Sequence, residues 1–172
     1  LSNGVEETVF RMARHREFDV AEMSLSSSCV SLSRPERPFI AIPVFPSRMF
    51  RHGFTFVSAK SGIKEPKDLA GKRIGTPEYQ LTAPVWIRGI LQDEYGVDPA
   101  SPEYFTGGLF EPGREEKITL NLPEKFRVRT IPAEKTLSGM IEAGELDAIQ
   151  APHPPSTFYS APQAVKRLHE NY

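Results

Sequence analysis

Apolar side chains recur at helical spacing in several segments of the chain, which predicts helices there. The first segment, Val5–Arg16, carries acidic residues at its start and basic residues at its end, the order that complements the helix dipole. The others are Ala83–Tyr95 and Leu137–Ala143, which are followed by Gly96 and Gly144. Glycine is the residue that most often ends a helix, so these two positions mark the expected helix ends.

Short runs rich in β-branched and aromatic residues predict strands between the helices. These runs are Phe18–Leu25, Phe39–Val44, Phe54–Ser58, Arg73–Gly75, Phe126–Ile131 and Asp147–Gln150. In the second half of the chain they alternate with the predicted helices. Such alternation indicates an α/β protein with a parallel or mixed sheet and helices on its faces.

The segment Lys67–Gln80 joins a polar turn, a short buried strand and the start of a helix. In open α/β sheets, ligands collect at the carboxyl ends of strands, beside helix N-termini whose N–H groups are unpaired. Thr76–Gln80 occupies such a position. The junction is therefore a candidate binding edge, and an anionic ligand is the natural expectation.

Composition narrows the class of protein without naming a function. With 172 residues, of which 39% are hydrophobic and 25% charged, the chain suits one globular domain or two small lobes. Its net charge of −1 gives no reason to expect nucleic acid or an anionic membrane as a partner. No apolar run approaches the ~20 residues that span a bilayer. The single cysteine, Cys29, excludes an intrachain disulfide and argues against a cysteine-based metal site.

The densest cationic cluster in a predicted loop consists of Arg48, Arg51 and His52. Guanidinium groups offer planar, paired donors that match a carboxylate. On a strand-like path Arg48 and His52 would project alike and Arg51 elsewhere, so one or two of the three would face a cleft. The alternative is surface charge paired with Glu22 or Glu36, and the sequence leaves both interpretations open.

Polar side chains also follow the predicted strands. Ser26 and Ser27 come after the first of them and can donate hydrogen bonds to a carboxylate or cap the next helix. At the junction, Thr76 and Gln80 can orient a polar substrate, and Tyr79 can stack on a ring or hydrogen-bond to it. These five residues are candidates for substrate binding.

Four further positions allow two interpretations each. Beside an anionic ligand the pKa of Glu78 would rise, so that it could hold a proton; otherwise Glu78 stabilises a helix start by about 0.3–1 kcal/mol. Thr106 and Gly107 begin a Thr-Gly-Gly loop that permits close approach to a ligand or is an ordinary turn. His153, in a proline-rich loop, fits a surface or a catalytic position. The histidines lack HxH or HExxH spacing, although a long-range metal site with His52, His153 and a carboxylate stays open.

Five stretches of the chain, in order and with similar spacing, resemble the 4,5-dihydroxyphthalate decarboxylase family. They are Glu17–Ser27, Phe39–His52, Gly75–Gln80, Phe105–Glu116 and Thr136–Ala148. The resemblance implies a two-lobed, type II periplasmic-binding-protein-like α/β fold. It also implies that the fold is partial, without its first strand and the C-terminal part of lobe 1. Residues 1–60 would then form partial lobe 1, residues 61–155 lobe 2, and residues 156–172 a return segment toward lobe 1.

The resemblance further implies non-oxidative decarboxylation of 4,5-dihydroxyphthalate, or a related hydroxylated aromatic carboxylate, to 3,4-dihydroxybenzoate and carbon dioxide. The hypothesis assigns the proton donor to His52 or Glu78. Arg48 or Arg51, with Ser26 and Ser27, would bind the carboxylates, and the ring would be positioned by Tyr79, Gln80 and Thr106.

No cofactor is expected for this reaction, although a divalent metal stays open. The alternative is a solute-binding protein that passes an aromatic or other carboxylate to an ABC-type transporter. The enzyme would be cytoplasmic and the carrier periplasmic, and either could form a homo-oligomer. In both cases the expected partner is a small aromatic carboxylate.

Overall fold

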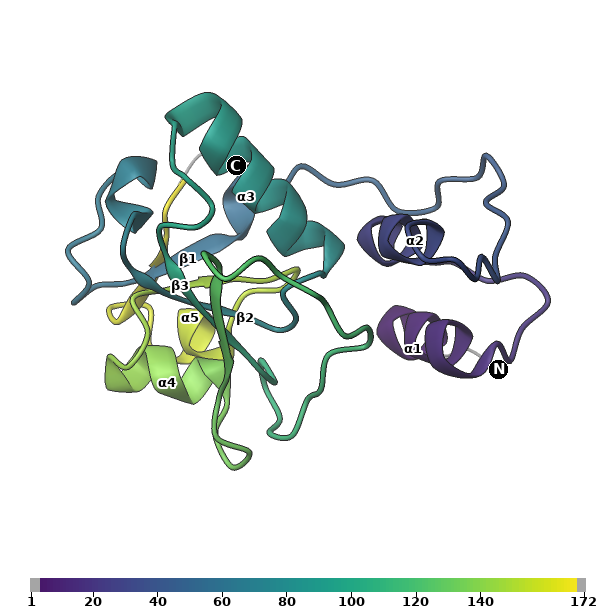
Figure 1. The fold of residues 1–172 in the computed structure, drawn as a ribbon. Helices are drawn as coiled ribbons and strands as arrows, with labels where there is room; N and C mark the ends of the chain where they lie inside the picture. Colours follow the sequence, from purple (N-terminus) through teal and green to yellow (C-terminus); the bar gives the residue numbers. More distant parts are fainter. Residues whose placement is uncertain (1–3, 170–172) are drawn as a thin grey trace.

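The computed structural model of the chain describes residues 4–169, which form one six-stranded sheet flanked by helices, with two N-terminal helices beside it (Figure 1). The α-helices within this range are α1 (Val5–His15), α2 (Leu25–Leu32), α3 (Thr82–Tyr95), α4 (Leu137–Ala143) and α5 (Ser156–Ser160). The strands are β1 (Thr55–Ser58), β2 (Arg73–Thr76), β3 (Glu103–Thr106), β4 (Arg127–Thr130), β5 (Ala148–Gln150) and β6 (Val165–Arg167). Two 3-10 turns are η1 (His52–Phe54) and η2 (Pro66–Leu69). The predicted α/β class is confirmed.

The sheet has the strand order β4-β3-β2-β5-β1-β6. The pairs β2–β3, β3–β4 and β2–β5 are parallel, whereas β1 is antiparallel to both of its neighbours, β5 and β6. In the β2–β3 pair Thr76 lies opposite Thr106. The carboxyl ends of these two strands therefore meet at one edge of the sheet, as the sequence predicted for a binding edge.

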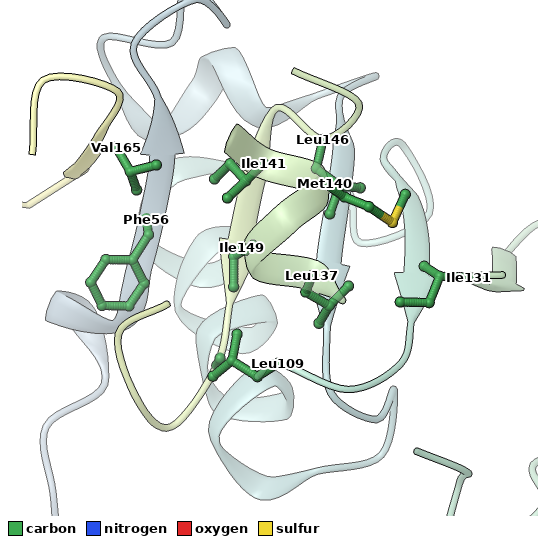
Figure 2. Packing of buried hydrophobic residues seen from close by; sticks show 10 residues of the cluster. Phe56, Leu109, Ile131, Leu137, Met140, Ile141, Leu146, Ile149 and Val165 are labelled. Atoms are coloured by element: carbon green, nitrogen blue, oxygen red, sulfur yellow. The ribbon is translucent and has the colours of Figure 1, made fainter. Parts of the chain in front are cut away.

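Buried apolar side chains form two clusters, one on each face of the sheet. Adjacent residues of a strand divide between them, because side chains alternate across a sheet: Phe56 belongs to one cluster and Val57 to the other. Figure 2 shows the first cluster, in which Leu137 and Ile141 of α4 lie over Ile149 of β5. The second cluster packs α3 and η2 on the opposite face. Burying each such side chain stabilises the fold by about 1.5–3 kcal/mol.

The two N-terminal helices lie beside the sheet rather than on its faces (Figure 1). Long-range hydrogen bonds join them to the loop between β3 and β4. Arg14 of α1 donates to the main-chain oxygens of Glu116 (2.8 Å) and Lys117 (2.9 Å). Arg34, which follows α2, donates to the main-chain oxygen of Thr119 (2.9 Å). This loop therefore fixes the position of both helices.

The predicted helices are confirmed, two of them together with their ends. Gly96 and Gly144 end α3 and α4 in the left-handed conformation, with φ angles of 69° and 80°. This conformation strains any residue that has a Cβ, so a glycine at these positions was an informative signal. Within residues 4–169, no helix combines the length and the apolar character that crossing a membrane requires.

Two predicted strands are wrong. Phe18–Leu25 is irregular up to the start of α2, and Phe39–Val44 pairs with none of the described strands. Ile40, in the second of these runs, is 94% exposed. A strand needs a neighbour for its hydrogen bonds, and local side-chain preference cannot supply one. Conversely, β3, β6 and α5 were not predicted; because the predicted β5 is no longer than these elements, their length alone does not explain the difference.

The sheet also includes strands from outside the predicted second lobe. β1 lies within residues 1–60 and β6 within residues 156–172, yet both belong to the same sheet as β2–β5. They are adjacent and antiparallel at one end of the sheet. The chain therefore enters and leaves this sheet through neighbouring strands.

Candidate functional site

The loop after β2 passes between the sheet and the N-terminal helices. Thr76, the last residue of β2, is fully buried, and its hydroxyl donates to the main-chain oxygen of Glu78 (3.2 Å). The main-chain N–H of Gly107, at the end of β3, donates to the main-chain oxygen of Thr76 (3.3 Å). Thr106 is buried opposite Thr76. The residues that the sequence placed at the carboxyl edge of the sheet are thus brought together there.

The Glu78 carboxylate is fully buried and surrounded by donors. Its Oε1 accepts from Arg114 Nη2 (2.6 Å) and pairs with Lys117 Nζ, and its Oε2 accepts from Gln80 Nε2 (2.9 Å). Burial on its own raises the pKa of Glu78, but the charges and hydrogen bonds of Lys117 and Arg114 outweigh burial, so the pKa lies below its ordinary value. Glu78 is held as a carboxylate, the opposite of the raised pKa that the sequence argument associated with a bound anion.

Arg114 extends this cluster to the N-terminal helices. Its Nη1 pairs with the carboxylate of Glu6 on α1 at 2.7 Å while its Nη2 pairs with Glu78. Glu78 does not cap α3, because the helix starts at Thr82 with Leu81 as its N-cap residue. Glu78 instead forms ion pairs with two cations of the loop between β3 and β4, Arg114 and Lys117.

A second carboxyl group, Glu116, lies next to Glu78 in a different environment. Its Oε1 accepts from the main-chain N–H of Tyr79 at 2.6 Å. Its Oε2 is buried and has no hydrogen-bond partner among residues 4–169. Burial raises the pKa of Glu116 to about 7, an effect that the negative charge of Glu78 reinforces and the Tyr79 N–H opposes. Glu116 can therefore hold a proton near neutral pH.

The serines at the start of α2 bind the same junction loop. Ser27 Oγ donates to Gln80 Oε1 (2.8 Å), and Ser26 Oγ donates to the main-chain oxygen of Gln80. Ser24 Oγ lies 2.7 Å from the hydroxyl of Thr82 at the start of α3. Ser24 is the N-cap residue of α2, yet its side chain makes no capping hydrogen bond. The serines therefore connect α2 to the junction instead of capping their own helix.

A cavity of about 390 Å³ lies between α2 and α3. Its lining includes the predicted site residues Ser26, Tyr79 and Gln80 together with Leu25, Cys29, Val30, Thr82, Val85, Trp86, Arg88 and Leu120. The volume falls within the range of about 300–1,000 Å³ that is usual for small-molecule sites. The accessible surface of this lining is almost entirely apolar, which suits the ring of an aromatic molecule.

Arg88 of α3 is the one charged residue in this lining. Its side chain is buried, at 8% exposure, and its guanidinium carbon lies 3.9 Å from the centre of the Tyr79 ring and 5.5 Å from that of Tyr104. Nη2 donates to the main-chain oxygen of Tyr79 at 2.6 Å, whereas Nη1 has no partner within the described part of the chain. Burial lowers the pKa of Arg88.

The predicted loop arginines do not line this cavity. Arg48 is exposed, with only a long hydrogen bond to the main-chain oxygen of Phe45 (3.4 Å), and Arg51 lies over the ring of Phe54 at 5.3 Å. Both belong to the segment that runs from α2 to β1. The proposed surface pairing with Glu22 or Glu36 also differs from the structure, where Glu36 pairs with Arg16.

The predicted histidines also lie elsewhere. His52 Nε2 is 3.3 Å from the carboxylate of Glu94, near the C-terminal end of α3. Glu94 follows Thr82 by twelve residues, which places it about 18 Å along the helix from the junction. His153 is exposed in the loop after β5. Among residues 4–169, His, Cys, Asp and Glu side chains do not gather in a group of three or more that could hold a metal ion.

The glycines after β3 have a packing role. A Cβ at Gly107 would lie 2.4 Å from Ile131 Cγ1, and a Cβ at Gly108 would lie 1.6 Å from the main-chain oxygen of Glu111. Glycine is therefore required at both positions by neighbouring protein atoms. Close approach to a ligand is not needed to explain either of them.

Sequence reasoning missed four charged residues around the junction: Arg88, Arg114, Glu116 and Lys117. Three of them belong to one charged run, which is usually a solvated surface. The available signal was their position at the end of, or directly after, the stretch Phe105–Glu116 that carries part of the family resemblance. For Arg88, the signal was a lone cation beside the buried Ile87 in a helix that packs on the sheet.

Comparison with known proteins identifies two relatives along almost the whole chain. No protein-family model matches the sequence. The chain is 46% identical over 166 residues to a 4,5-dihydroxyphthalate decarboxylase of Comamonas testosteroni, and 45% identical over 166 residues to one of Pseudomonas putida. Each alignment covers 96% of this chain, which spans 50% and 64%, respectively, of the two relatives. The chain is therefore similar to 4,5-dihydroxyphthalate decarboxylases along almost its whole length, over the half to two thirds of those proteins that it spans.

Proposed function

We propose that the protein catalyses the non-oxidative decarboxylation of 4,5-dihydroxyphthalate, or of a closely related hydroxylated aromatic carboxylate, to 3,4-dihydroxybenzoate and carbon dioxide. The observation that carries this proposal is the identity of 45–46% over 96% of the chain to two proteins of that name. The cavity between α2 and α3 supports it, because its size and its largely apolar surface suit a small aromatic ring.

The reaction balances with one proton and without a change of oxidation state at the protein. The ring hydroxyl para to the departing carboxylate donates electron density, and a proton adds to the ring carbon that bears this carboxylate. The carbon–carbon bond then breaks, its electron pair restores the aromatic ring, and carbon dioxide leaves. The protein has to hold the ring and supply the proton.

The roles of the junction residues follow from their positions. Tyr79, Gln80 and Ser26 line the cavity and are proposed to position the ring and its hydroxyl groups. Neither of the two carboxyl groups beside Tyr79 lines the cavity; Glu116 is the proposed proton source, because it is bonded to the main-chain N–H of the cavity residue Tyr79 and its pKa of about 7 lets it carry a proton at neutral pH. Glu78 keeps its charge and is proposed to organise the cations around it.

The proposal is tested by incubating the full-length protein with 4,5-dihydroxyphthalate and measuring carbon dioxide and 3,4-dihydroxybenzoate. Repeated turnover with equal amounts of the two products is expected. Tight binding of the substrate without turnover would contradict the proposal and favour a solute-binding protein. Glu116→Gln and Glu115→Gln form a matched pair for this assay, since Glu115 is the exposed neighbour of Glu116.

The two-lobed, type II periplasmic-binding-protein-like fold is part of the same proposal. The mixed sheet would form the second lobe, and α1 and α2 would belong to the first. The adjacent, antiparallel strands β1 and β6 support this division, because a chain that crosses between lobes twice can do so side by side. Because β1 and β6 count with the second lobe, this lobe extends beyond the predicted residues 61–155, to before Thr55 and past Arg167.

A further inference from the structure

We propose that Arg88 is the anion-binding residue of the cavity and that it holds the carboxylate that stays on the ring after decarboxylation. The identity of this ligand rests on the proposed function. The anion site itself rests on the cavity and on the contacts of Arg88, and the two parts can be tested separately.

Arg88 is a buried cation whose hydrogen-bond donors are not all satisfied. Arg88 lines the cavity at 8% exposure, and one of its two terminal amino groups, Nη1, lacks a hydrogen-bond partner among residues 4–169. Within the same range no carboxylate forms an ion pair with Arg88. Burying an unpaired guanidinium is costly, and buried polar groups are nearly always paired. A carboxylate in the cavity would provide both the acceptor and the opposite charge.

The Arg88 guanidinium is held in a fixed position before a ligand binds. The rings of Tyr79 and Tyr104 lie 3.9 Å and 5.5 Å from its central carbon, and Nη2 is bound to the main-chain oxygen of Tyr79. Fixing a donor in advance removes part of the entropy cost of binding. The loop arginines Arg48 and Arg51 have no comparable support.

The chemistry of the reaction decides which carboxylate Arg88 binds. The departing carboxylate loses its negative charge as it becomes carbon dioxide. A cation placed on it would stabilise the substrate more than the transition state and would slow the reaction. The other carboxylate keeps its charge throughout, so a cation on it binds substrate, transition state and product alike. Arg88 should therefore act on affinity, for the product as well as for the substrate.

The ring of such a ligand would lie against the apolar part of the lining. Trp86, Val85 and Leu120 provide this surface. The hydroxyls of Ser26 and Thr82 lie on another side of the lining, where they hydrogen-bond to each other and to neighbouring protein groups, so phenolic groups of the ligand would have to share or replace these bonds. The ligand class is thus an aromatic acid with one carboxylate on the guanidinium and ring hydroxyls on the serine and threonine side.

The direct test is calorimetric titration of the full-length protein with 3,4-dihydroxybenzoate. In Arg88→Gln the affinity should fall about 10- to 100-fold, the usual value of a hydrogen bond to a charged group. Arg88→Lys keeps the charge but lacks the planar guanidinium, so its affinity should lie between those of the native protein and Arg88→Gln. Arg37 is exposed and makes no side-chain hydrogen bond or ion pair within residues 4–169, so Arg37→Gln should leave the affinity unchanged. Weak binding of catechol, which has no carboxylate, should be the same in all four proteins.

A second variant tests the cavity without changing Arg88, so that the proposal can be judged even if Arg88→Gln does not fold. Val85 is 39% exposed at the rim of the cavity, so Val85→Trp should fill the cavity while it leaves Arg88 and the core in place. It should weaken binding at least 10-fold without a large change in melting temperature. Cys29 is exposed and lines the same cavity, so bound 3,4-dihydroxybenzoate should also slow its alkylation by iodoacetamide.

The outcomes separate this inference from the proposed function. An unchanged affinity of folded Arg88→Gln for 3,4-dihydroxybenzoate would overturn the inference, and so would failure of the native protein to bind it. Binding that depends on Arg88, in a protein that releases no carbon dioxide from 4,5-dihydroxyphthalate, would refute the reaction and keep the anion site. If the protein releases carbon dioxide from 4,5-dihydroxyphthalate but Arg88→Gln binds 3,4-dihydroxybenzoate as tightly as the native protein, the proposed function stands and the anion site at Arg88 is refuted.

Discussion

Two groups of charges lie on either side of Tyr79, and they differ in whether their members satisfy one another. On the side of its main-chain N–H, the Glu78 carboxylate neutralises Arg114 and Lys117, and its oxygens accept hydrogen bonds from several donors. On the side of its main-chain oxygen, Arg88 is buried beside a cavity with one amino group unpaired. Both groups contain buried cations, yet only in the first do carboxylates form ion pairs with them; Glu116 acts on Arg88 electrostatically without pairing with it.

This difference separates a structural cluster from a binding site. A buried carboxylate that is already paired has no capacity for a ligand, and its removal leaves its cations stranded. A buried cation without a partner can still bind an anionic ligand. In the ligand-free protein it does not add to the free energy of unfolding. The comparison therefore assigns Glu78 to the integrity of the junction and Arg88 to the ligand.

The largest effect expected from this comparison is on stability at Glu78. Glu78→Ala leaves the buried Lys117 without a counter-charge and Arg114 with Glu6 alone, which should lower the free energy of unfolding by about 3–5 kcal/mol. Urea unfolding followed by circular dichroism measures this change. Glu115→Ala removes an exposed carboxylate two residues before Lys117 and should stay within about 0.5 kcal/mol. A loss at Glu78 no larger than that of the control would contradict a structural role.

The next effect is on catalysis at Glu116. If Glu116 supplies the proton, Glu116→Gln should lower kcat about 10²- to 10⁴-fold, with Glu115→Gln close to the native value. Because the pKa of Glu116 is about 7, its proton is present below that pH and lost above it. The kcat of the native enzyme should accordingly fall as pH rises through about 7. The proton source lies elsewhere if Glu116→Gln keeps both the rate and this decline.

Glu116 also makes a prediction about stability that does not depend on activity. Its pKa in the folded protein is above the ordinary value of 4.5, so the folded protein holds this proton more tightly than the unfolded chain. The contribution to stability is complete below pH 4.5 and is lost as pH rises through about 7. Glu116→Gln should therefore gain stability relative to the native protein over this range, by about 1–3 kcal/mol. Melting temperatures measured at pH 4.5 and pH 8 give this difference, and an equal gap at both values would exclude the raised pKa.

Local patterns predicted the parts of the fold that local forces decide. The bounds of α4 follow from apolar spacing and from Gly144, whose left-handed conformation ends the helix. The strand around Ile74 and the loop after it were likewise visible, because turn residues and apolar residues are neighbours there. Phe39–Val44 has the composition of a strand, but whether it becomes one depends on a hydrogen-bonding neighbour, and no local pattern supplies that information.

The candidate site divides in the same way. Tyr79 and Gln80 were predicted because they follow the strand around Ile74, and they do line the cavity. Ser26 also lines it, but it was predicted from a strand that the structure replaces with irregular chain and α2. The partners that define the electrostatics were not predicted, because they come from far away in the sequence: Lys117 follows Glu78 by 39 residues. A charged run gives no indication that it will fold inward until the loop that carries it is placed.

The smallest expected effect is a change in stability at Arg88, and it tests most directly whether the two groups of charges beside Tyr79 differ. Arg88→Met removes the unpaired charge and keeps an apolar stem between Tyr79 and Tyr104. The main-chain oxygen of Tyr79 loses its hydrogen bond, at a cost of about 1 kcal/mol, but relief of the buried charge offsets this cost. The stability of the ligand-free protein should therefore change by less than about 1 kcal/mol. With 3,4-dihydroxybenzoate at 100 times its Kd, the native protein alone should gain about 2.7 kcal/mol, measured by urea unfolding. If Arg88→Met instead costs as much as Glu78→Ala without ligand, Arg88 is a structural cation like Lys117, and the two sides of Tyr79 do not differ.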